Sequence, residues 1–205
     1  MEAYFPGMKR EEKSFDKYFE PLNKEILEPC ITENIETDME KLKQVFHYIV
    51  DAIGSQANTG KTLLFKILYF CDFDYYLEYE ELLTKELYRK IDHGPAPIHF
   101  DEIVEQLEKE GKILTTCKEK TNPRDYKKYT YISLLKPDLS LLSAKEIKFI
   151  DETLDKYSHY KSTEISEISH QDLPWRATEN SDIIDYDLVF YRDNLLLEED
   201  NDDDC

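Results

Sequence analysis

The chain has 205 residues, enough for one domain with a sizeable core, and its 15 Tyr and 10 Phe argue against disorder along the whole chain. Its formal net charge of −19 disfavours nonspecific binding to nucleic-acid phosphates and is compatible with a partner that presents a basic face. Because no apolar run approaches the roughly 20 residues that span a bilayer, and residues 1–10 lack a signal-peptide pattern, we expect a cytoplasmic protein without membrane contact.

The first predicted elements are an extension and two helices. Residues 1–38 alternate charges with isolated aromatic residues, so we expect an N-terminal extension that packs on the domain or binds a partner. Apolar residues at 3/4 spacing predict an amphipathic helix over 39–53. After a polar loop at 54–60, the stretch 61–79 is apolar on most of its surface, and we expect it to be the central buried helix.

A short extended segment is predicted at 87–91, just before the sequence Gly-Pro-Ala-Pro at 94–97. Each proline fixes its own φ and pushes the preceding residue toward an extended conformation. These four residues are therefore expected to form a stiff, non-helical strut. A helix over about 98–110 follows, and Gly111 is a natural residue for its C-terminal end.

Two stretches rich in β-forming residues, 113–117 and 128–134, flank a loop that contains Asn122-Pro123, and this predicts an antiparallel hairpin. A helix followed by a hairpin is the arrangement of a winged-helix unit. Further along, Ser143 and Glu146 have the spacing of a capping box and predict the start of another helix.

The remaining predicted elements complete a mainly α-helical chain. We expect a short helix over 163–170, capped by Ser162, and a last helix over 185–191. The fold class is therefore mainly α with a small antiparallel β-hairpin, an α+β helical domain that contains a winged-helix-like unit. This domain is expected to cover 39–194 and to be followed by an acidic, disordered tail at 195–205.

The sequence offers little that predicts catalysis. Thr59-Gly60-Lys61-Thr62 is not a P-loop, because the required first glycine position is Ser55 and Gly54 lies one residue too early. The five histidines lack zinc-ligand spacing, and the four scattered cysteines predict reduced structural thiols. No nucleophile stands beside a recognisable base. We expect no enzyme, no cofactor, no metal site and no catalytic residue.

Three groups of residues have two interpretations each. The carboxylates from Asp72 to Glu81 could form an acid cluster, but a solvated end of the buried helix is the favoured interpretation. His93 is expected to bond loop carbonyls beside Gly94. His170 and Trp175 either pack the end of a helix against the core or form part of a partner-binding surface. The sequence does not distinguish between these two interpretations.

One locally basic stretch lies at the tip of the predicted hairpin. It could be a DNA-contacting wing or an ordinary solvated loop, and the acidic background favours the loop. Its cations are Lys118, Lys120, Arg124, Lys127 and Lys128.

The order of four short motifs resembles a known family. Phe70-Cys71-Asp72 lies in the aromatic helix, and the sequence Gly-Pro-Ala-Pro follows at 94–97. Ser169-His170 precedes Pro174-Trp175, and an aromatic stretch at 186–191 comes last. Over roughly 39–192 the chain is similar to the Panacea domain, the SocA-like antitoxin family of bacteria and phages.

The resemblance implies a protein that neutralises a toxin by direct contact, and one family member instead delivers its toxin to a protease. Our hypothesis is a non-enzymatic antitoxin whose acidic surface meets a basic face of a cytoplasmic toxin. A winged-helix DNA-binding regulator and a proteolytic adaptor are alternatives, although Glu102, Glu105 and Glu108 make DNA an unfavourable partner. Whether the chain forms a homo-oligomer is left open. The residues proposed to bind the partner are Asp72, Tyr75, Tyr76, His93, Pro95, Pro97, His170, Pro174 and Trp175.

Overall fold

A computed structural model describes residue 32, residues 35–118 and residues 128–192, all within the compact unit Ile31–Cys205. The predicted acidic tail and most of the predicted N-terminal extension lie outside the described residues. None of the described helices is long and apolar enough to cross a membrane.

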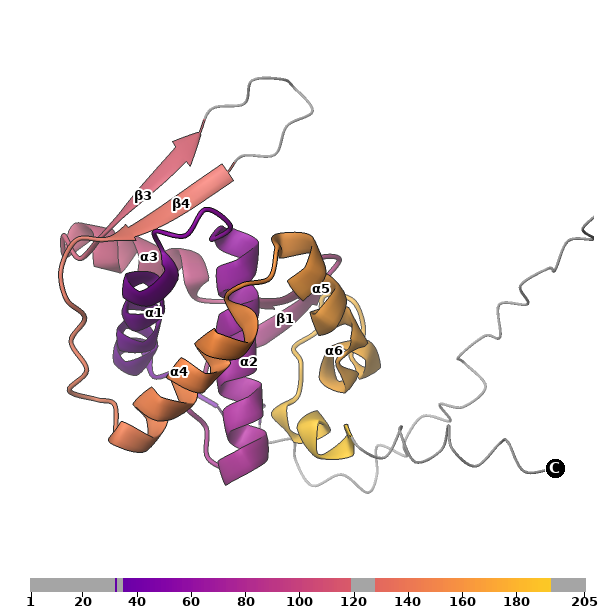
Figure 1. The fold of residues 1–205 in the computed structure, drawn as a ribbon. Helices are drawn as coiled ribbons and strands as arrows, with labels where there is room; N and C mark the ends of the chain where they lie inside the picture. The colour runs from indigo at the N-terminus through magenta and orange to yellow at the C-terminus, as the bar shows by residue number, and fades with distance from the viewer. Residues whose placement is uncertain (1–31, 33–34, 119–127, 193–205) are drawn as a thin grey trace, which may run out of the picture. The chain divides into compact units, whose positions relative to one another are not determined.

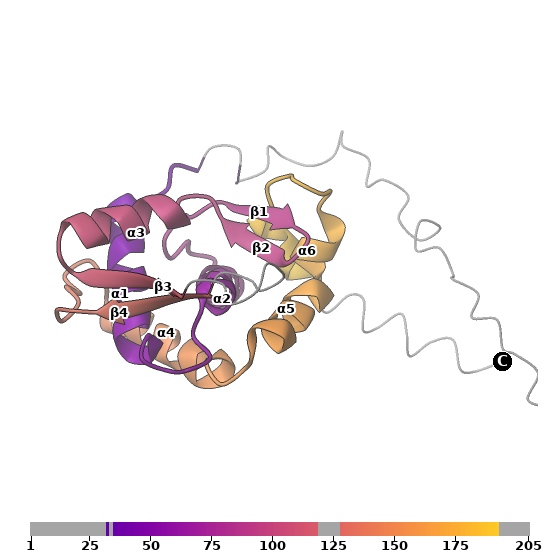
Figure 2. The same ribbon diagram turned by 90° about the horizontal axis from the view of Figure 1, so that it is seen from above.

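Helix α2, Lys61–Tyr79, lies at the centre of the unit, and helix α1, Met39–Ile53, lies to its left in Figure 1. Helix α1 begins after Asp38, whose carboxylate accepts a hydrogen bond from the Lys41 backbone N–H at 3.1 Å. Helix α2 is buried along most of its length. Figure 2 looks almost along α2 and shows other elements around it. Both predicted helices are confirmed, with the predicted bounds.

The predicted Gly-Pro-Ala-Pro strut is a β-strand. Strand β1, Tyr88–Ile91, pairs antiparallel with strand β2, Gly94–Pro97, so that Tyr88 faces Pro97 and Ile91 faces Gly94. The extended segment was predicted at the right place, but its pairing with β2 was not. The other edge of β1 is also occupied, because the Ile184 N–H donates to the Tyr88 carbonyl at 2.8 Å and the Lys90 N–H to the Asp182 carbonyl at 2.9 Å.

A helix and a second hairpin follow in the predicted order. Helix α3 is Phe100–Lys109, and it ends before Gly111, which has a φ of 68°. Strand β3, Ile113–Lys118, pairs antiparallel with β4, Lys128–Ser133. The hairpin is confirmed, whereas a winged-helix unit stays a prediction.

The C-terminal part is helical. Helix α4 is Ala144–Tyr157, and the predicted capping box holds its start: the Glu146 carboxylate accepts from the Ser143 N–H at 2.7 Å. Helix α5 is Ser162–Gln171, with Lys161 rather than Ser162 at its N-cap.

Two short helices complete the described chain. Helix α6, Leu173–Ala177, was not predicted; it carries a proline in its first turn, where no backbone N–H is needed. The predicted last helix is a 3₁₀ helix, η3, Tyr186–Tyr191. Asp185 starts it by accepting from the Asp187 N–H at 3.1 Å, and such tight helices occur as short pieces of this kind.

Aromatic side chains join these elements in one core. Phe73 of α2 stacks on Tyr186 of η3 with ring centroids 4.3 Å apart. Phe70 of α2 stacks on Tyr157 of α4 at 4.2 Å. The buried Tyr186 hydroxyl donates to the Glu86 carbonyl at 2.6 Å, so its polar atom is satisfied inside the core.

Candidate functional site

The two proline-containing motifs, far apart in the sequence, meet beside α2. Gly94 of β2 has a φ of 95°, a conformation that favours glycine. A Cβ atom at this position would overlap Ser169 Oγ of α5 and lie 2.7 Å from Cε of Lys66. Gly94 therefore allows α2, β2 and α5 to approach one another closely. We call this meeting point the motif junction, and it includes Lys66, Gly94, Pro95, Ser169, His170 and Trp175.

Lys66 lies at the centre of the motif junction, and sequence reasoning missed it. Its side chain is 1% exposed, and its ammonium donates to the Pro95 carbonyl oxygen at 2.8 Å. Burial lowers the pKa of Lys66 to about 7, because the apolar surroundings disfavour the charged form. The only signal in the sequence was a single lysine inside an apolar helix.

His170 and Trp175 form the outer side of the motif junction. Their rings stack with centroids 4.3 Å apart, and the Lys90 ammonium lies 4.3 Å from the indole centroid, in cation–π range. Lys90 also donates to the Thr178 carbonyl at 2.7 Å. His170 Nε2 and Trp175 Nε1 are buried and have no hydrogen-bond partner within the described part of the chain.

The electrostatic surroundings of His170 are cationic, although the whole chain is acidic. Burial lowers the pKa of His170, and the charges of Lys66, His93 and Lys90 lower it further, whereas Glu167 opposes them. His170 is therefore held in its neutral form to a lower pH than an ordinary histidine.

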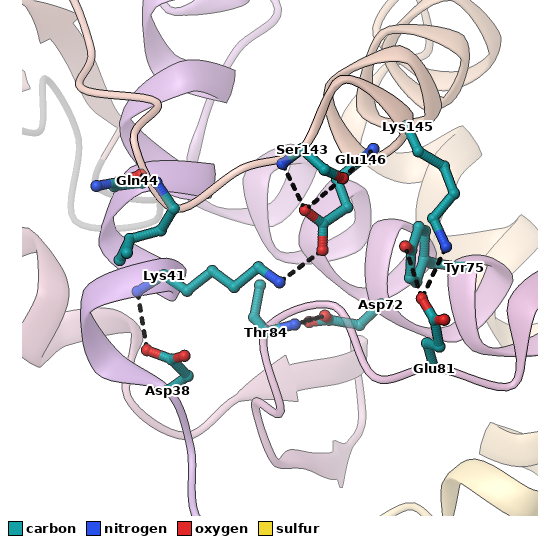
Figure 3. Close-up of polar contacts among 11 residues, drawn as sticks. Asp38, Lys41, Gln44, Asp72, Tyr75, Glu81, Thr84, Ser143, Lys145 and Glu146 are labelled. Carbon is teal, nitrogen blue, oxygen red and sulfur yellow. Dashed lines mark hydrogen bonds and ion pairs between the residues drawn. The ribbon is translucent and has the colours of Figure 1, made fainter.

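Asp72 is the centre of a second, buried cluster. It accepts hydrogen bonds from the Thr84 N–H at 2.9 Å and the Tyr88 hydroxyl at 2.6 Å, and Figure 3 shows the contact with Thr84. The Thr84 hydroxyl also donates to it, at 2.8 Å. Burial raises the pKa of Asp72 to about 7 against the effect of these donors. The predicted solvated helix end is thus wrong for Asp72, which is 1% exposed, but right for Glu78 and Glu81, which are exposed.

A second carboxylate is buried close to this cluster. Glu86 accepts from the His99 backbone N–H at 2.8 Å, and its carboxylate lies 2.9 Å from the ring nitrogen Nδ1 of His99, within hydrogen-bond distance. Burial raises the pKa of Glu86, while the contacts with His99 lower it. The pair connects the start of β1 to the start of α3, and sequence reasoning missed it.

Tyr75 and Tyr76 are buried, and the hydroxyl of each donates to a carboxylate. The Tyr75 hydroxyl donates to Glu81 at 3.3 Å, and Lys145 of α4 contacts the same carboxylate at 2.7 Å (Figure 3). The Tyr76 hydroxyl donates to Asp187 of η3 at 2.7 Å. Hydrogen bonds from these two tyrosines therefore connect the C-terminal end of α2 to the segment that follows it and to η3.

The predicted partner-binding residues differ in their solvent exposure. His93 is exposed at the β1–β2 turn, and His170 and Trp175 are half-buried at the motif junction. The remaining residues are buried, so their side chains support the surface residues and have little contact with solvent themselves. A role of the whole set in partner binding stays a prediction. The buried residues are Asp72, Tyr75, Tyr76, Pro95, Pro97 and Pro174.

The predicted basic stretch is only partly described. Lys118 and Lys128 are exposed and face each other across the β3–β4 hairpin. The Lys128 ammonium donates to the Ala57 carbonyl at 2.9 Å. Lys120, Arg124 and Lys127 lie outside the described residues. Within the described part, no three His, Cys, Asp or Glu side chains are grouped so that they could hold a metal ion.

Comparison with known proteins identifies one family. The family model of the antitoxin SocA-like Panacea domain matches residues 64–176, from the start of α2 to α6. This range contains the whole motif junction and the buried cluster around Asp72. No curated protein and no solved structure matches the chain.

Proposed function

Because the chain belongs to the SocA-like Panacea antitoxin family, we propose that it is the antitoxin of a toxin–antitoxin system and neutralises a cognate cytoplasmic toxin by direct protein–protein binding. The observation that carries this proposal is the family match over residues 64–176. It includes more than half of the chain and the point where the two proline-containing motifs meet.

In this proposal the chain acts by binding and not as an enzyme. The groups with strongly shifted pKa values make internal contacts: Lys66 bonds the Pro95 carbonyl, and Asp72 bonds Thr84. Such contacts fix α2 against β2 and against the segment before β1. A scaffold whose elements are fixed by such contacts suits an inhibitor that must present a fixed surface.

The charge of the chain supports a toxin with a basic face. A net charge of −19 favours encounter with a positively charged surface and makes the association rate sensitive to salt. An enzyme that handles RNA or nucleotides presents such a surface around its substrate. Covering that surface would block the toxin without any chemical step.

The test is co-expression of this chain with the product of the adjacent open reading frame. We expect the neighbour alone to arrest growth, and this chain to restore growth and to co-purify with it. Size-exclusion chromatography of the co-purified complex gives its stoichiometry and reveals a homo-oligomer if one forms. A harmless neighbour, or rescue without any complex, would remove the support for neutralisation by binding.

Two other outcomes would change the mechanism. Faster loss of the toxin in cells that contain this chain would indicate a proteolytic adaptor. Tight, sequence-selective binding in a gel shift at physiological salt would indicate a DNA-binding regulator. Glu102, Glu105 and Glu108 are exposed on α3, which opposes the use of that helix in the major groove.

A further inference from the structure

A groove of about 730 Å³ lies between α2, α4 and α5. Its floor is apolar: Phe70 and Tyr157 stack on each other there, and Phe149 and Ile168 lie beside them. Leu77 of α2 lines the same groove and is 40% exposed. Clefts of about 300 to 1,000 Å³ are typical of binding sites, so this groove can accept several apolar side chains.

Arg192 lines the groove together with its two carboxylate partners. Its guanidinium donates to Asp172 through Nε and Nη2, both at 2.8 Å, and to Asp74 through Nη1 at 2.7 Å. The Tyr69 hydroxyl also donates to Asp172, at 2.7 Å. The guanidinium is therefore already neutralised and fixed by two carboxylates, and the Lys156 ammonium also lies 4.0 Å from Asp74.

Over its whole lining the groove has four carboxylates and two cations. Glu78 and Glu152 line it together with one lysine, Lys156. The Glu152 and Lys156 side chains are 60% and 64% exposed, so these charges lie at the solvent-facing rim, where Lys148 pairs with Glu152 at 3.3 Å. An apolar floor within a lining that carries more carboxylates than cations is complementary to an apolar surface flanked by lysine or arginine.

The charge of each candidate occupant indicates which of them the groove favours. A second copy of this chain carries the same net charge of −19, and in the chain's own C-terminal segment the three leucines at 195–197 are followed directly by six acidic residues at 198–204. Either would bring negative charge to a groove whose lining already has more carboxylates than cations. A toxin with a basic face brings the opposite charge. Grooves between helices accept an amphipathic helix that inserts apolar side chains from one face.

We propose that this groove is the docking site for the toxin, and that it receives an amphipathic helix of the toxin that carries lysine or arginine beside its apolar stripe. The identity of the partner rests on the antitoxin function proposed above. The preference of the groove for such a helix does not, so the two can be tested separately.

The first experiment uses two fluorescein-labelled peptides of about 18 residues with identical leucine, lysine and alanine content. In one peptide the leucines follow 3/4 spacing, and in the other they are scrambled. Fluorescence anisotropy with the full chain measures their affinities. We expect the striped peptide to bind at least about tenfold more tightly, because only it presents a continuous apolar face.

Groove variants then locate the binding. Leu77→Lys introduces a charge at the apolar wall, and we expect it to remove the advantage of the striped peptide. The double variant Glu78→Lys/Glu152→Lys reverses the rim charge and should weaken the striped peptide about tenfold at low salt and less at high salt. These positions are exposed, so folding is expected to persist, and thermal unfolding verifies it.

Matched control variants carry the same changes elsewhere. Leu134→Lys places a lysine at a leucine that is 52% exposed and lies outside the groove. Glu102→Lys/Glu105→Lys makes the same change in net charge on α3. We expect both controls to bind the striped peptide within about twofold of the unchanged chain. The same four variants are then tested for binding to the toxin and for rescue of growth.

Several outcomes would overturn the proposal. Equal affinity for the two peptides would show that the groove has no preference for an apolar stripe. Toxin binding and rescue that are unaffected in the groove variants would leave the antitoxin function intact but place the toxin elsewhere. A dimer that Leu77→Lys disrupts would make a second copy the occupant. If the peptides bind as expected but the adjacent gene product neither binds nor arrests growth, the antitoxin function fails and the toxin is removed as the occupant.

Discussion

The ammonium of Lys66 donates to the carbonyl oxygen of Pro95 at 2.8 Å, and this bond joins the central helix to a strand that contains two prolines. Proline has no N–H but keeps its carbonyl, so the strand can still accept a hydrogen bond from a side chain. Gly94 lets the two backbones approach closely enough for this contact. The motif junction thus contains a hydrogen bond from a buried lysine to a backbone carbonyl, although burial disfavours the charged form of that lysine.

The burial of Lys66 should make stability depend on pH. Its pKa is lowered to about 7 in the folded chain from 10.5, so between these values the unfolded chain binds more protons than the folded one. Stability should therefore rise as pH increases through this range. In Lys66→Met this rise should be smaller by an amount on the order of 4 kcal/mol.

Chemical denaturation from pH 6 to 10.5 measures this dependence. Lys109→Met, which changes a lysine on the solvent-exposed end of α3, serves as the control and should follow the unchanged chain. If Lys66→Met shows the same pH slope as the unchanged chain, the ammonium is not desolvated as the structure indicates.

The two glycines with positive φ should differ in their tolerance of alanine. Gly94→Ala combines backbone strain with overlap against Ser169, and we expect a loss of about 3 kcal/mol or more in the free energy of unfolding. Gly111 has a φ of 68° and open space around it, so Gly111→Ala should cost only about 1 kcal/mol. Urea denaturation of the two variants measures the difference. Equal losses would mean that contact at the motif junction adds nothing to the backbone strain.

Asp72 should make stability fall as pH rises toward neutrality. Burial raises its pKa to about 7 from 3.8, so between these values the folded chain binds more protons than the unfolded one. The contribution to stability is present at low pH and is lost as pH rises through this range. Asp72→Asn should flatten this decline by an amount on the order of 3 kcal/mol.

Denaturation of the variant between pH 4 and 7.5 measures this effect. Asp155→Asn, on an exposed position of α4, is the control and should keep the original slope. A decline of unchanged size in Asp72→Asn would assign the pH dependence to another group, with Glu86 as the next candidate.

The only tryptophan in the sequence should report the protonation of His170. The two rings stack at 4.3 Å, so a positive charge on the imidazole will change the fluorescence of the indole. Because burial and neighbouring cations lower the pKa of His170, the midpoint should lie below 6.5. The transition should disappear in His170→Gln and persist in His159→Gln. A midpoint above 6.5 would contradict the cationic surroundings described for the motif junction.

The sequence predicted the elements whose pattern is local. Apolar spacing placed α1 and α2, and alternating β-forming residues placed the β3–β4 hairpin. It did not predict β2, because prolines normally argue against a strand. The partners that make β2 possible, β1 and Lys66, are recognisable only after the chain has folded.

The candidate site was predictable only in part. Ser169, His170 and Trp175 were identified through their motif, but the burial of Lys66 and Asp72 was not. Lys66 bonds a residue 29 positions away and Asp72 one 12 positions away, and no local pattern encodes these partners. Asp72 is followed by several exposed acids, so its sequence context resembles a solvated helix end.

The β1–β2 hairpin is closed to strand addition from outside. One edge of β1 is paired with β2, and the other accepts and donates hydrogen bonds with residues 181–184. Two of the four β2 residues are prolines, which cannot donate to an incoming strand. A partner therefore cannot lengthen this small sheet with its own backbone, and neither can an unfolded neighbour in a crowded cell. Recognition at this end of the molecule has to rely on side chains, which makes it selective for sequence.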